Sequence, residues 1–344
     1  MKILECTIRD GGYAIDFQWD ATEIEGMVRD LAAAGFEYIE IGHGLGLGAS
    51  RQMTPSLCSD AEMATIATGV KGDAKIGAFF IPGIGNADDL KQFRDLGADF
   101  IRIGTDVSQS ESAWPFAELA AKLGFEVRYN FMKTYVAKPF DILRRASALV
   151  DRGATVIAIV DSAGGMLPDQ VAAYVDVLRD GLTAEIGFHG HNNLLLANAN
   201  SLTAVQHGAS SIDTTLLGMG RGGGNAQTET MLVVLERAGY PTGVNPLEVA
   251  KIAERYVSVK PARLKGANEL ELIYGFALFH SGFTKRVQDV AAAFGVPYQD
   301  LILEVSRYAK ENPSTELIEE AASQLRQEGR VAIHFPKFVH RSWN

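Results

Sequence analysis

The feature that most constrains the fold is a phrase that recurs along the chain: a helical stretch, one glycine, and then a short apolar strand. The recurring glycines are Gly35, Gly97, Gly124, Gly153 and Gly208. Glycine just past a helix end suits a left-handed C-cap, so each phrase predicts a helix that ends where a strand begins. Gly97, Gly124 and Gly153 are spaced by 27 and 29 residues. This spacing indicates a helix–strand unit of roughly 30 residues.

Apolar runs between these phrases complete a set of eight strands. We expect the strands at residues 3–8, 38–41, 75–80, 100–103, 127–129, 156–160, 185–189 and 212–213. Eight strands that alternate with helices predict an α/β fold, a (β/α)8 TIM barrel over residues 1–240. The competing architecture is a doubly wound open sheet. It would normally have fewer strands and a Gly-rich dinucleotide turn after the first strand, which this chain lacks.

After Gly239 the pattern changes, and residues 241–344 are predicted to form a C-terminal helical domain. Prolines at 241, 246 and 261 interrupt the chain, and a helical region follows up to about residue 328. Its apolar residues recur at helical spacing: Phe276, Phe279, Phe283, Val287 and Val290. We expect this stripe to pack the domain on the barrel, where the domain would cover the barrel mouth. An exposed part of the stripe would instead suit contact with a partner.

Composition and charge narrow the classes of function. The 344 residues are 47% hydrophobic and 22% charged, with a formal charge of −10. This surplus of acidic residues argues against nucleic acid or an anionic membrane as a general partner. Two cysteines, Cys6 and Cys58, give no disulfide framework, and no apolar run reaches transmembrane length. Charges near the N-terminus argue against a signal peptide, so a cytoplasmic protein is expected.

The sequence His189-Gly190-His191 at the end of an apolar run predicts a metal site. Side chains at positions i and i+2 of a strand point to the same side, so both imidazoles can reach one ion. Far upstream, Arg9-Asp10 ends the first strand and offers a carboxylate beside an arginine. Two histidines and one aspartate leave open positions on a divalent metal for substrate and water. Asp10, His189 and His191 are therefore the predicted ligands.

Further polar side chains follow other strands of the predicted barrel. In such barrels the active site lies where the strands end. The candidates for substrate binding at these ends are Arg9, His43, Lys133, Ser162 and Asn225, the last in the Gly-rich run 218–225. Because these side chains would point into one mouth, their convergence is a stronger signal than any single motif.

With these motifs, the chain resembles the metal-dependent pyruvate aldolases of the 4-hydroxy-2-oxovalerate aldolase branch. This branch belongs to the superfamily of the isopropylmalate synthases and hydroxymethylglutaryl-CoA lyases. The resemblance is carried by the Arg-Asp-Gly run at 9–11, the His-x-His pair at 189–191, the runs at 38–50, 161–164 and 224–226, and the tail after residue 260. It implies that Asp10, His189 and His191 hold a divalent metal, typically Mn²⁺, with Mg²⁺ or Co²⁺ as alternatives. It also implies that Arg9 stabilises an enolate oxygen and that Asn225 lies close to the metal.

The resemblance further implies a carbon–carbon lyase. The expected activity is that of a divalent-metal-dependent aldolase that cleaves or forms a 4-hydroxy-2-oxo acid through a pyruvate enolate. Its substrates would be a small 2-oxo acid and an aldehyde. Aldolases of this branch work beside an acylating aldehyde dehydrogenase, so such an enzyme is a candidate partner. A homo-oligomer is a candidate assembly.

The chain departs from this branch at three positions. The branch carries a histidine as general base after its Arg-Asp-Gly run, where this chain has Tyr13, and a tyrosine in its tail, where this chain has His280. The pKa of a free tyrosine is near 10, against about 6.5 for histidine. We therefore hypothesise that His280 supplies the base and that Tyr13 orients the substrate. Leu45 replaces a residue that is often acidic in the branch.

Other chemistries remain open at the level of the sequence. Lys133, at the end of the fifth strand, would suit a metal-free Schiff-base aldolase. The same superfamily contains acyl-CoA-dependent condensing enzymes and lyases, which use related enolate chemistry. Two histidines and a carboxylate also describe a non-haem iron oxygenase. Finally, a metal-bearing barrel could serve as a non-catalytic scaffold for a partner.

Overall fold

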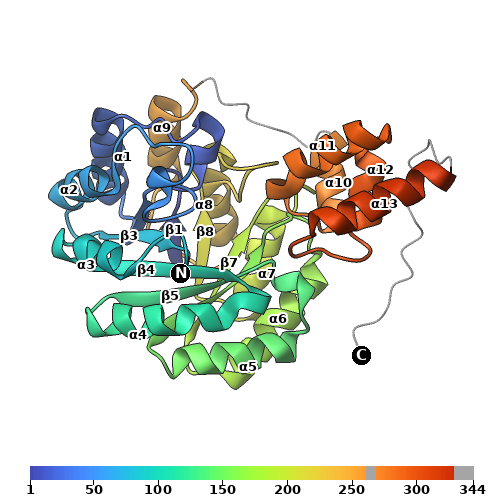
Figure 1. Ribbon diagram of the computed structural model, residues 1–344. Helices are drawn as coiled ribbons and strands as arrows, with labels where there is room; N and C mark the ends of the chain where they lie inside the picture. The colour runs from blue at the N-terminus through green and yellow to red at the C-terminus, as the bar shows by residue number, and fades with distance from the viewer. Residues whose placement is uncertain (261–268, 329–344) are drawn as a thin grey trace.

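The computed structural model describes residues 1–260 and 269–328, and Figure 1 shows a barrel with a group of helices beside it. The strands are β1 (Lys2–Glu5), β2 (Tyr38–Ile41), β3 (Lys75–Phe80), β4 (Phe100–Asp106), β5 (Glu126–Met132), β6 (Ala154–Asp161), β7 (Glu185–Gly190) and β8 (Ser211–Thr214). Neighbouring strands pair in parallel, and β1 closes the barrel on β8 with Leu4 opposite Asp213. The predicted (β/α)8 TIM barrel is confirmed, and the open sheet is excluded.

Helices surround the barrel and then continue beyond it. They are α1 (Ala21–Ala33), α2 (Asp60–Val70), α3 (Ala87–Asp95), α4 (Trp114–Lys122), α5 (Pro139–Val150), α6 (Pro168–Gly181), α7 (Ala197–His207), α8 (Thr228–Arg237), α9 (Pro246–Tyr256), α10 (Glu269–Ala277), α11 (Thr284–Phe294), α12 (Tyr298–Val305) and α13 (Thr315–Glu328). The five recurring glycines each follow a helix and have φ between 81° and 115°. They therefore adopt the left-handed conformation that the sequence predicted for them.

Helix α1 shows how local sequence sets these elements. The Asp20 side chain accepts a hydrogen bond from the Glu23 backbone, and the Glu23 side chain accepts one from the Asp20 backbone. This capping box satisfies two amide groups that would otherwise lack partners at the helix start. Ile24, Met27 and Leu31 then recur at helical spacing and are buried. These apolar residues form one face of the helix, and this face packs against the barrel.

Two large hydrophobic cores underlie the fold, beside a small cluster of Leu4, Cys6, Tyr38 and Phe100. The first joins the strands to the outer helices and extends into α9 through Val249, Ile252 and Val257. The second lies within α10–α13 and contains Phe279 and Val287 from the apolar stripe. The buried residues of the first core extend to Val257, and the boundary expected at residue 240 stays a prediction. Within the described residues, no helix combines the length and the hydropathy that crossing a membrane requires.

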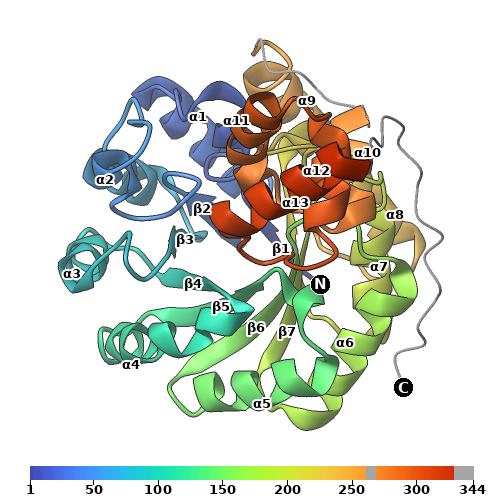
Figure 2. The same ribbon diagram turned by 45° about the vertical axis from the view of Figure 1, so that its right-hand side comes forward.

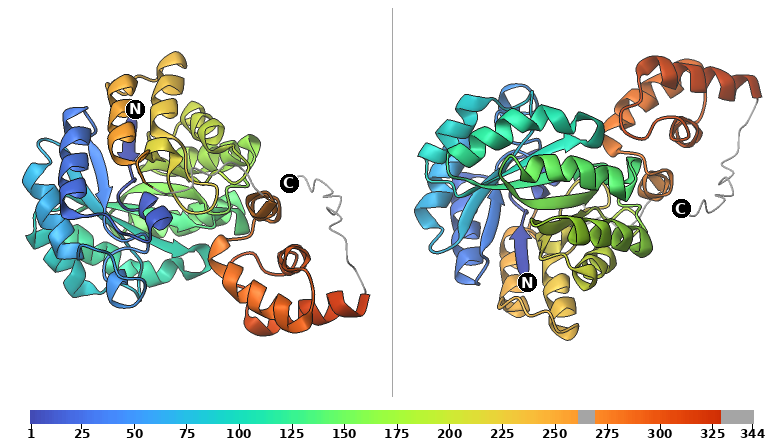
Figure 3. Two further views of the ribbon diagram at one scale, coloured as in Figure 1. Left: turned by 90° about the horizontal axis from the view of Figure 1, so that it is seen from above. Right: turned by 90° about the horizontal axis from the view of Figure 1, so that it is seen from below.

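The group α10–α13 stands at the carboxyl end of the barrel strands. Lys133, which follows β5, donates to the Glu311 carbonyl at 2.6 Å, and the Ser108 amide donates to Glu311 Oε1 at 2.9 Å. Phe283 faces the barrel, because Lys133 Nζ lies 5.0 Å from the centre of its ring. Figure 2 and Figure 3 likewise place these helices against one part of the barrel. This position brings residues of the second core to the barrel mouth.

Candidate metal centre

The three predicted metal ligands meet at the carboxyl end of the barrel. Asp10 follows β1 and precedes the 3-10 turn Gly11–Ile15, whereas His189 lies in β7 and His191 just after it. One donor atom of each of these three residues lies within 4.8 Å of the others, and all three residues are buried. A carboxylate oxygen and two imidazole nitrogens at this separation can bind one divalent cation.

The hydrogen bonds of the two imidazoles leave one nitrogen of each for a metal. His189 Nδ1 is 3.0 Å from Asp213 Oδ2, and His191 Nδ1 donates to the Gly224 carbonyl at 3.3 Å. A carbonyl only accepts, so the proton of His191 lies on Nδ1 and the lone pair on Nε2. Burial lowers the pKa of His191 to about 3, which keeps the ring neutral near pH 7. Such outer partners are typical of metal-binding histidines.

Asn225 supports the carboxylate of Asp10 and provides a test of whether a metal fits here. Its Nδ2 donates to Asp10 Oδ1 and to the Met219 carbonyl, both at 3.1 Å. Its Oδ1 is buried and has no hydrogen-bond partner among the described residues. A buried acceptor without a donor is costly, and a cation beside Asp10 would satisfy it. The loop needs glycine at position 220, because a Cβ there would collide with Asn225 Nδ2.

Arg9 lies directly beside these ligands. Its Nη1 is 2.7 Å from Asp10 Oδ2, and its Nε donates to Glu40 Oε2 at 2.8 Å. Burial by itself raises the pKa of Asp10, but Arg9 and the two histidines outweigh it, so the net pKa lies well below the usual value. Asp10 is therefore a carboxylate near pH 7, as a metal ligand must be.

Behind the site, buried side chains form what we call the charge ring, in the order Asp10, Arg9, Glu40, Arg102, Asp213 and His189. Arg102 donates to Glu40 Oε2 at 2.6 Å and forms a second ion pair with Asp213. The ring closes where His189 Nε2 lies 3.5 Å from Asp10 Oδ2. Two metal ligands and Arg9 are thus fixed by one connected set of charges.

Glu40, Arg102 and Asp213 were not predicted as part of the site. Each lies in a short barrel strand, and each is at most 4% exposed. The sequence held one signal for these residues: a charged residue that stands between apolar neighbours in a predicted buried strand, as in Ile39-Glu40-Ile41. Such a residue is rare in a core unless it is paired.

The ligands open into one cavity of about 200 Å³ at the barrel mouth. The predicted site residues that line it are Arg9, Asp10, Tyr13, Lys133, Ser162, His189, His191 and His280. Residues that sequence reasoning missed also line it, among them Asp106, Asn130, Met132, Arg221 and Phe283. His280 and Phe283 come from the helical group, so the barrel and the second core both contribute to this cavity.

His43 and Asn225 do not line the cavity. Asn225 lies behind the metal ligands, as described above. Both ring nitrogens of His43 are engaged: Nδ1 accepts from the Leu45 amide at 3.0 Å, and Nε2 donates to the Thr54 carbonyl at 3.1 Å. These bonds give His43 a role in shaping the loop after β2. The substrate-binding role that was expected of it has no geometric support.

Lys133 lines the cavity with its amino group already engaged. Lys133 Nζ lies 2.8 Å from Asp106 Oδ2 and donates to the Glu311 carbonyl at 2.6 Å. A Schiff base forms by attack of a free amine lone pair, which this paired ammonium does not offer. The Lys133 backbone amide donates to Ser162 Oγ at 2.9 Å, so the Ser162 hydroxyl keeps its own proton for a further bond.

Tyr13 and His280 reach the cavity, but neither is poised as a base. Burial raises the pKa of Tyr13 above its usual value, so this side chain is a phenol near pH 7. Burial, followed by Arg221 and Lys133, lowers the pKa of His280 well below its usual value, so the ring is neutral. His280 Nδ1 accepts from the Gly282 amide at 3.1 Å, which places the proton on Nε2. His280 thus presents a donor, and the expected base role requires the other tautomer.

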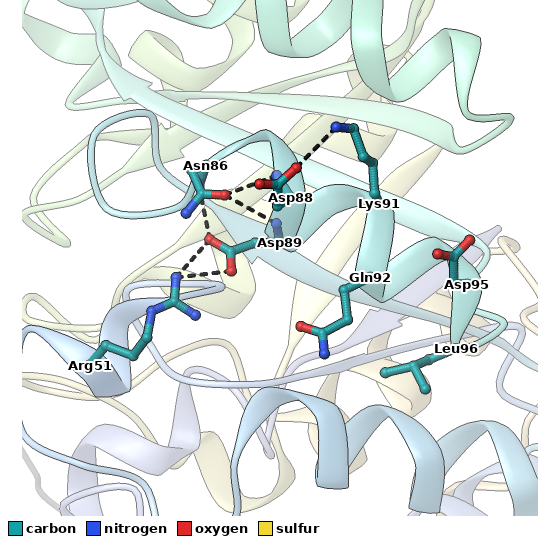
Figure 4. A pocket seen from close by; sticks show the side chains of 8 residues that line it. All are labelled: Arg51, Asn86, Asp88, Asp89, Lys91, Gln92, Asp95 and Leu96. Carbon is teal, nitrogen blue, oxygen red and sulfur yellow. Dashed lines mark hydrogen bonds and ion pairs between the residues drawn. The ribbon is translucent and has the colours of Figure 1, made fainter.

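A second hollow lies on the outer surface and shares no lining residue with the cavity (Figure 4). Most of its charged side chains pair with one another. Arg51 donates to Asp89 at 2.8 Å, and Lys91 donates to Asp88 at 2.9 Å. Because four of its five charged side chains are paired in this way, with Asp95 the exception, we assign no ligand to this hollow.

Comparisons with known proteins agree with this geometry. A family model described as HMGL-like matches residues 1–255. The chain is 35% identical over 328 residues to 4-hydroxy-2-oxovalerate aldolase from Moorella thermoacetica, which covers 95% of this chain and 97% of that protein. It is 34% identical over 326 residues to 4-hydroxy-2-oxovalerate aldolase 2 from Rhodococcus jostii, which covers 94% of this chain and 95% of that protein.

Among solved structures, the carboxyl transferase domain of Rhizobium etli pyruvate carboxylase is similar, with a TM-score of 0.79 and 15% identity. The match covers 95% of this chain and 60% of that chain. At this level of identity the likeness shows the fold alone.

Proposed function

Because the chain belongs to the HMGL-like family, we propose that it is a divalent-metal-dependent aldolase that cleaves or forms a 4-hydroxy-2-oxo acid through a pyruvate enolate. Two relatives that match almost the whole chain bear the name 4-hydroxy-2-oxovalerate aldolase. The observation that carries the proposal is the meeting of the three ligands with Arg9 at one cavity. The enzyme is thus a carbon–carbon lyase that acts on small molecules.

Asp10, His189 and His191 would hold the metal, and we propose Mn²⁺. When bound, a divalent cation supplies positive charge that polarises a carbonyl and stabilises a developing enolate. The carboxylate of Asp10 is a ligand type that suits Mn²⁺, and the two imidazoles argue against Mg²⁺, which is usually bound through oxygen ligands.

Arg9 supplies a second positive charge beside the ligands. Its Nη1 and Nε are held by Asp10 and Glu40, so the guanidinium is oriented before a substrate arrives. Its Nη2 has no hydrogen-bond partner among the described residues and is left to bind an enolate oxygen. A preorganised donor of this kind stabilises charge as it develops in the transition state.

We assign proton transfer to His280 and substrate orientation to Tyr13. In the cleavage direction, the 4-hydroxyl loses its proton as the C3–C4 bond breaks. In the reverse direction, the aldol addition, the aldehyde oxygen gains a proton as this bond forms. To accept a proton at Nε2, His280 must give up its bond from Gly282, at a cost of about 0.5–1.5 kcal/mol. Tyr13 keeps its phenolic proton and can donate a hydrogen bond to the substrate.

Substitution of these two residues separates their roles. His280→Ala is expected to lower kcat for cleavage by roughly 10²- to 10⁴-fold, the usual effect of losing a positioned acid–base group. Tyr13→Phe removes one hydrogen bond and keeps the ring, so a loss of about 10-fold is expected. Pyruvate release from 4-hydroxy-2-oxovalerate measures both. The opposite ranking would assign the proton transfer to Tyr13.

The proposed function is tested by the exchange of pyruvate methyl protons in deuterated water. Metal-free protein is incubated with pyruvate, with and without Mn²⁺, and the methyl signal is followed by NMR. Exchange that depends on Mn²⁺ is expected, because an enolate of pyruvate picks up deuterium at C3. Pyruvate that stays unaltered with folded, Mn²⁺-loaded protein would overturn the proposal and favour the scaffold alternative.

The geometry gives less support to an acyl-CoA-dependent reaction. A coenzyme A thioester needs a long binding surface, whereas this cavity has a volume of about 200 Å³ and is bordered by His280 and Phe283 of the helical group.

Turnover in the absence of oxygen would exclude the alternative of a non-haem iron oxygenase. An acylating aldehyde dehydrogenase partner, a homo-oligomer and a cytoplasmic location stay predictions.

A further inference from the structure

Arg221 is a cation in the cavity for which the reaction above has no use. It belongs to the Gly-rich run after β8, is half-buried and lines the cavity. Its guanidinium carbon lies 5.4 Å from the centre of the Tyr13 ring. Within residues 1–260 and 269–328, no carboxylate forms an ion pair with Arg221 and no acceptor forms a hydrogen bond with it.

The other two cations that line the cavity are neutralised. Arg9 is bonded to Asp10 and Glu40, and Lys133 is paired with Asp106 at 2.8 Å. A half-buried guanidinium loses part of its hydration, and here the Tyr13 ring offsets that loss only in part, because no carboxylate pairs with it among the described residues. Arg221 is therefore placed to bind an anion from outside the chain.

The balance of charge in the cavity supports the same reading. Its lining contains three cations, Arg9, Lys133 and Arg221, against two carboxylates, Asp10 and Asp106, and Glu40 behind the lining pairs with Arg9. A divalent cation at the ligands would add two positive charges to this balanced set, so one carboxylate of a 2-oxo acid would leave the site positive.

Arg221 lies toward the helical group. A Cβ on Gly282 would stand 3.9 Å from Arg221 Nη1, so the guanidinium borders the 3-10 turn Ser281–Phe283. The 2-oxo acid end of the substrate is served by Arg9 and the metal ligands. Arg221 is thus suited to the other end of the substrate, which derives from the aldehyde.

We propose that the acceptor aldehyde carries an anionic group, a carboxylate or a phosphate, that Arg221 binds through its planar pair of donors. This inference rests on the proposed aldolase function and names its substrate class. In the addition, C3 of pyruvate loses one proton, the C3–C4 bond forms, and the aldehyde oxygen gains one proton. No other reactant is consumed.

The test compares matched pairs of acceptors with the Mn²⁺-loaded full chain. The first pair is succinic semialdehyde and its neutral methyl ester, and the second is glyceraldehyde 3-phosphate and glyceraldehyde. The wild-type protein is expected to prefer the anionic member of one pair by about 10- to 100-fold in kcat/KM, as a charged hydrogen bond allows. The pair that shows the preference identifies the anion as carboxylate or phosphate.

Variants of Arg221 then assign the preference. Arg221→Gln should erase it, and Arg221→Lys should keep part of it, because the charge remains while the planar fork is lost. Arg51→Gln, at an exposed arginine outside the cavity, is the matched control and should keep the full preference.

Three outcomes would overturn the inference. No preference in the wild-type protein would show that the acceptor is neutral. An equal loss of both acceptors in Arg221→Gln would show that Arg221 only positions Tyr13. A raised KM for pyruvate in methyl-proton exchange by Arg221→Gln, with the acceptor preference intact, would place Arg221 at the 2-oxo acid. Absence of exchange by the wild-type protein is a separate result that overturns the aldolase function itself.

Discussion

Asp10→Asn is expected to abolish the Mn²⁺-dependent exchange of pyruvate methyl protons and to weaken Mn²⁺ binding by more than about 100-fold. The substitution keeps the shape of the side chain and removes its charge. Loss of an outer partner of a metal ligand alone costs roughly 10- to 100-fold in affinity, so loss of a ligand costs more. Arg9 would also lose one of its two carboxylate partners and keep Glu40.

Calorimetric titration of Mn²⁺ into metal-free protein measures this binding without reference to activity. Asp88→Asn, at an exposed aspartate of the outer surface, is the matched control and should bind Mn²⁺ as the wild-type protein does. Thermal unfolding of the metal-free variant shows whether it is folded. An Asp10→Asn protein that binds Mn²⁺ with wild-type affinity would show that the metal lies elsewhere.

Arg102→Met is expected to lower the free energy of unfolding by about 3–5 kcal/mol, the usual cost of removing one partner of a buried ion pair. Arg102 is 1% exposed and bridges Glu40 and Asp213 in the charge ring. Methionine fills much of the same space, so the loss would arise from two buried carboxylates without their shared cation. Adding Glu40→Gln should recover part of the stability, because it removes one of those charges.

Urea unfolding at pH 7 in the presence of a chelator measures this effect without a contribution from metal binding. Arg51→Met, at an exposed arginine, is the control and should change the free energy of unfolding by less than about 0.5 kcal/mol. A loss below about 1 kcal/mol for Arg102→Met would mean that water, and not Arg102, compensates the two carboxylates.

The sequence predicted the barrel because the relevant signals are local. A glycine such as Gly97 marks the end of a helix within a few residues, and the apolar run that follows is by its own pattern typical of a buried strand. The place of α9 could not be predicted in the same way. Its periodic apolar residues indicate a buried face, but a pattern of this kind does not say which core the face meets. Ile252 in fact joins the core of the barrel.

The site was partly predictable for a similar reason. His189 and His191 share one side of a strand, and the end of β1 brings Asp10 to them once the barrel closes. The charge ring depends instead on pairs that are far apart in sequence. Arg102 meets Glu40 across 62 residues and Asp213 across 111 residues, and only the closed barrel fixes these pairs. Lys133 is a further case, since its partner Asp106 comes from another strand.

The presence of two hydrophobic cores bears on how such an enzyme can diverge. The strands that carry the metal ligands belong to one core, and the helices that flank His280 belong to another. Substitutions within α10–α13 can therefore accumulate without disturbing the packing beneath the ligands. A lineage can in this way keep the residues that form the pyruvate enolate unchanged. The side chains of α10–α13 that border the electrophile, the aldehyde, can meanwhile change under selection.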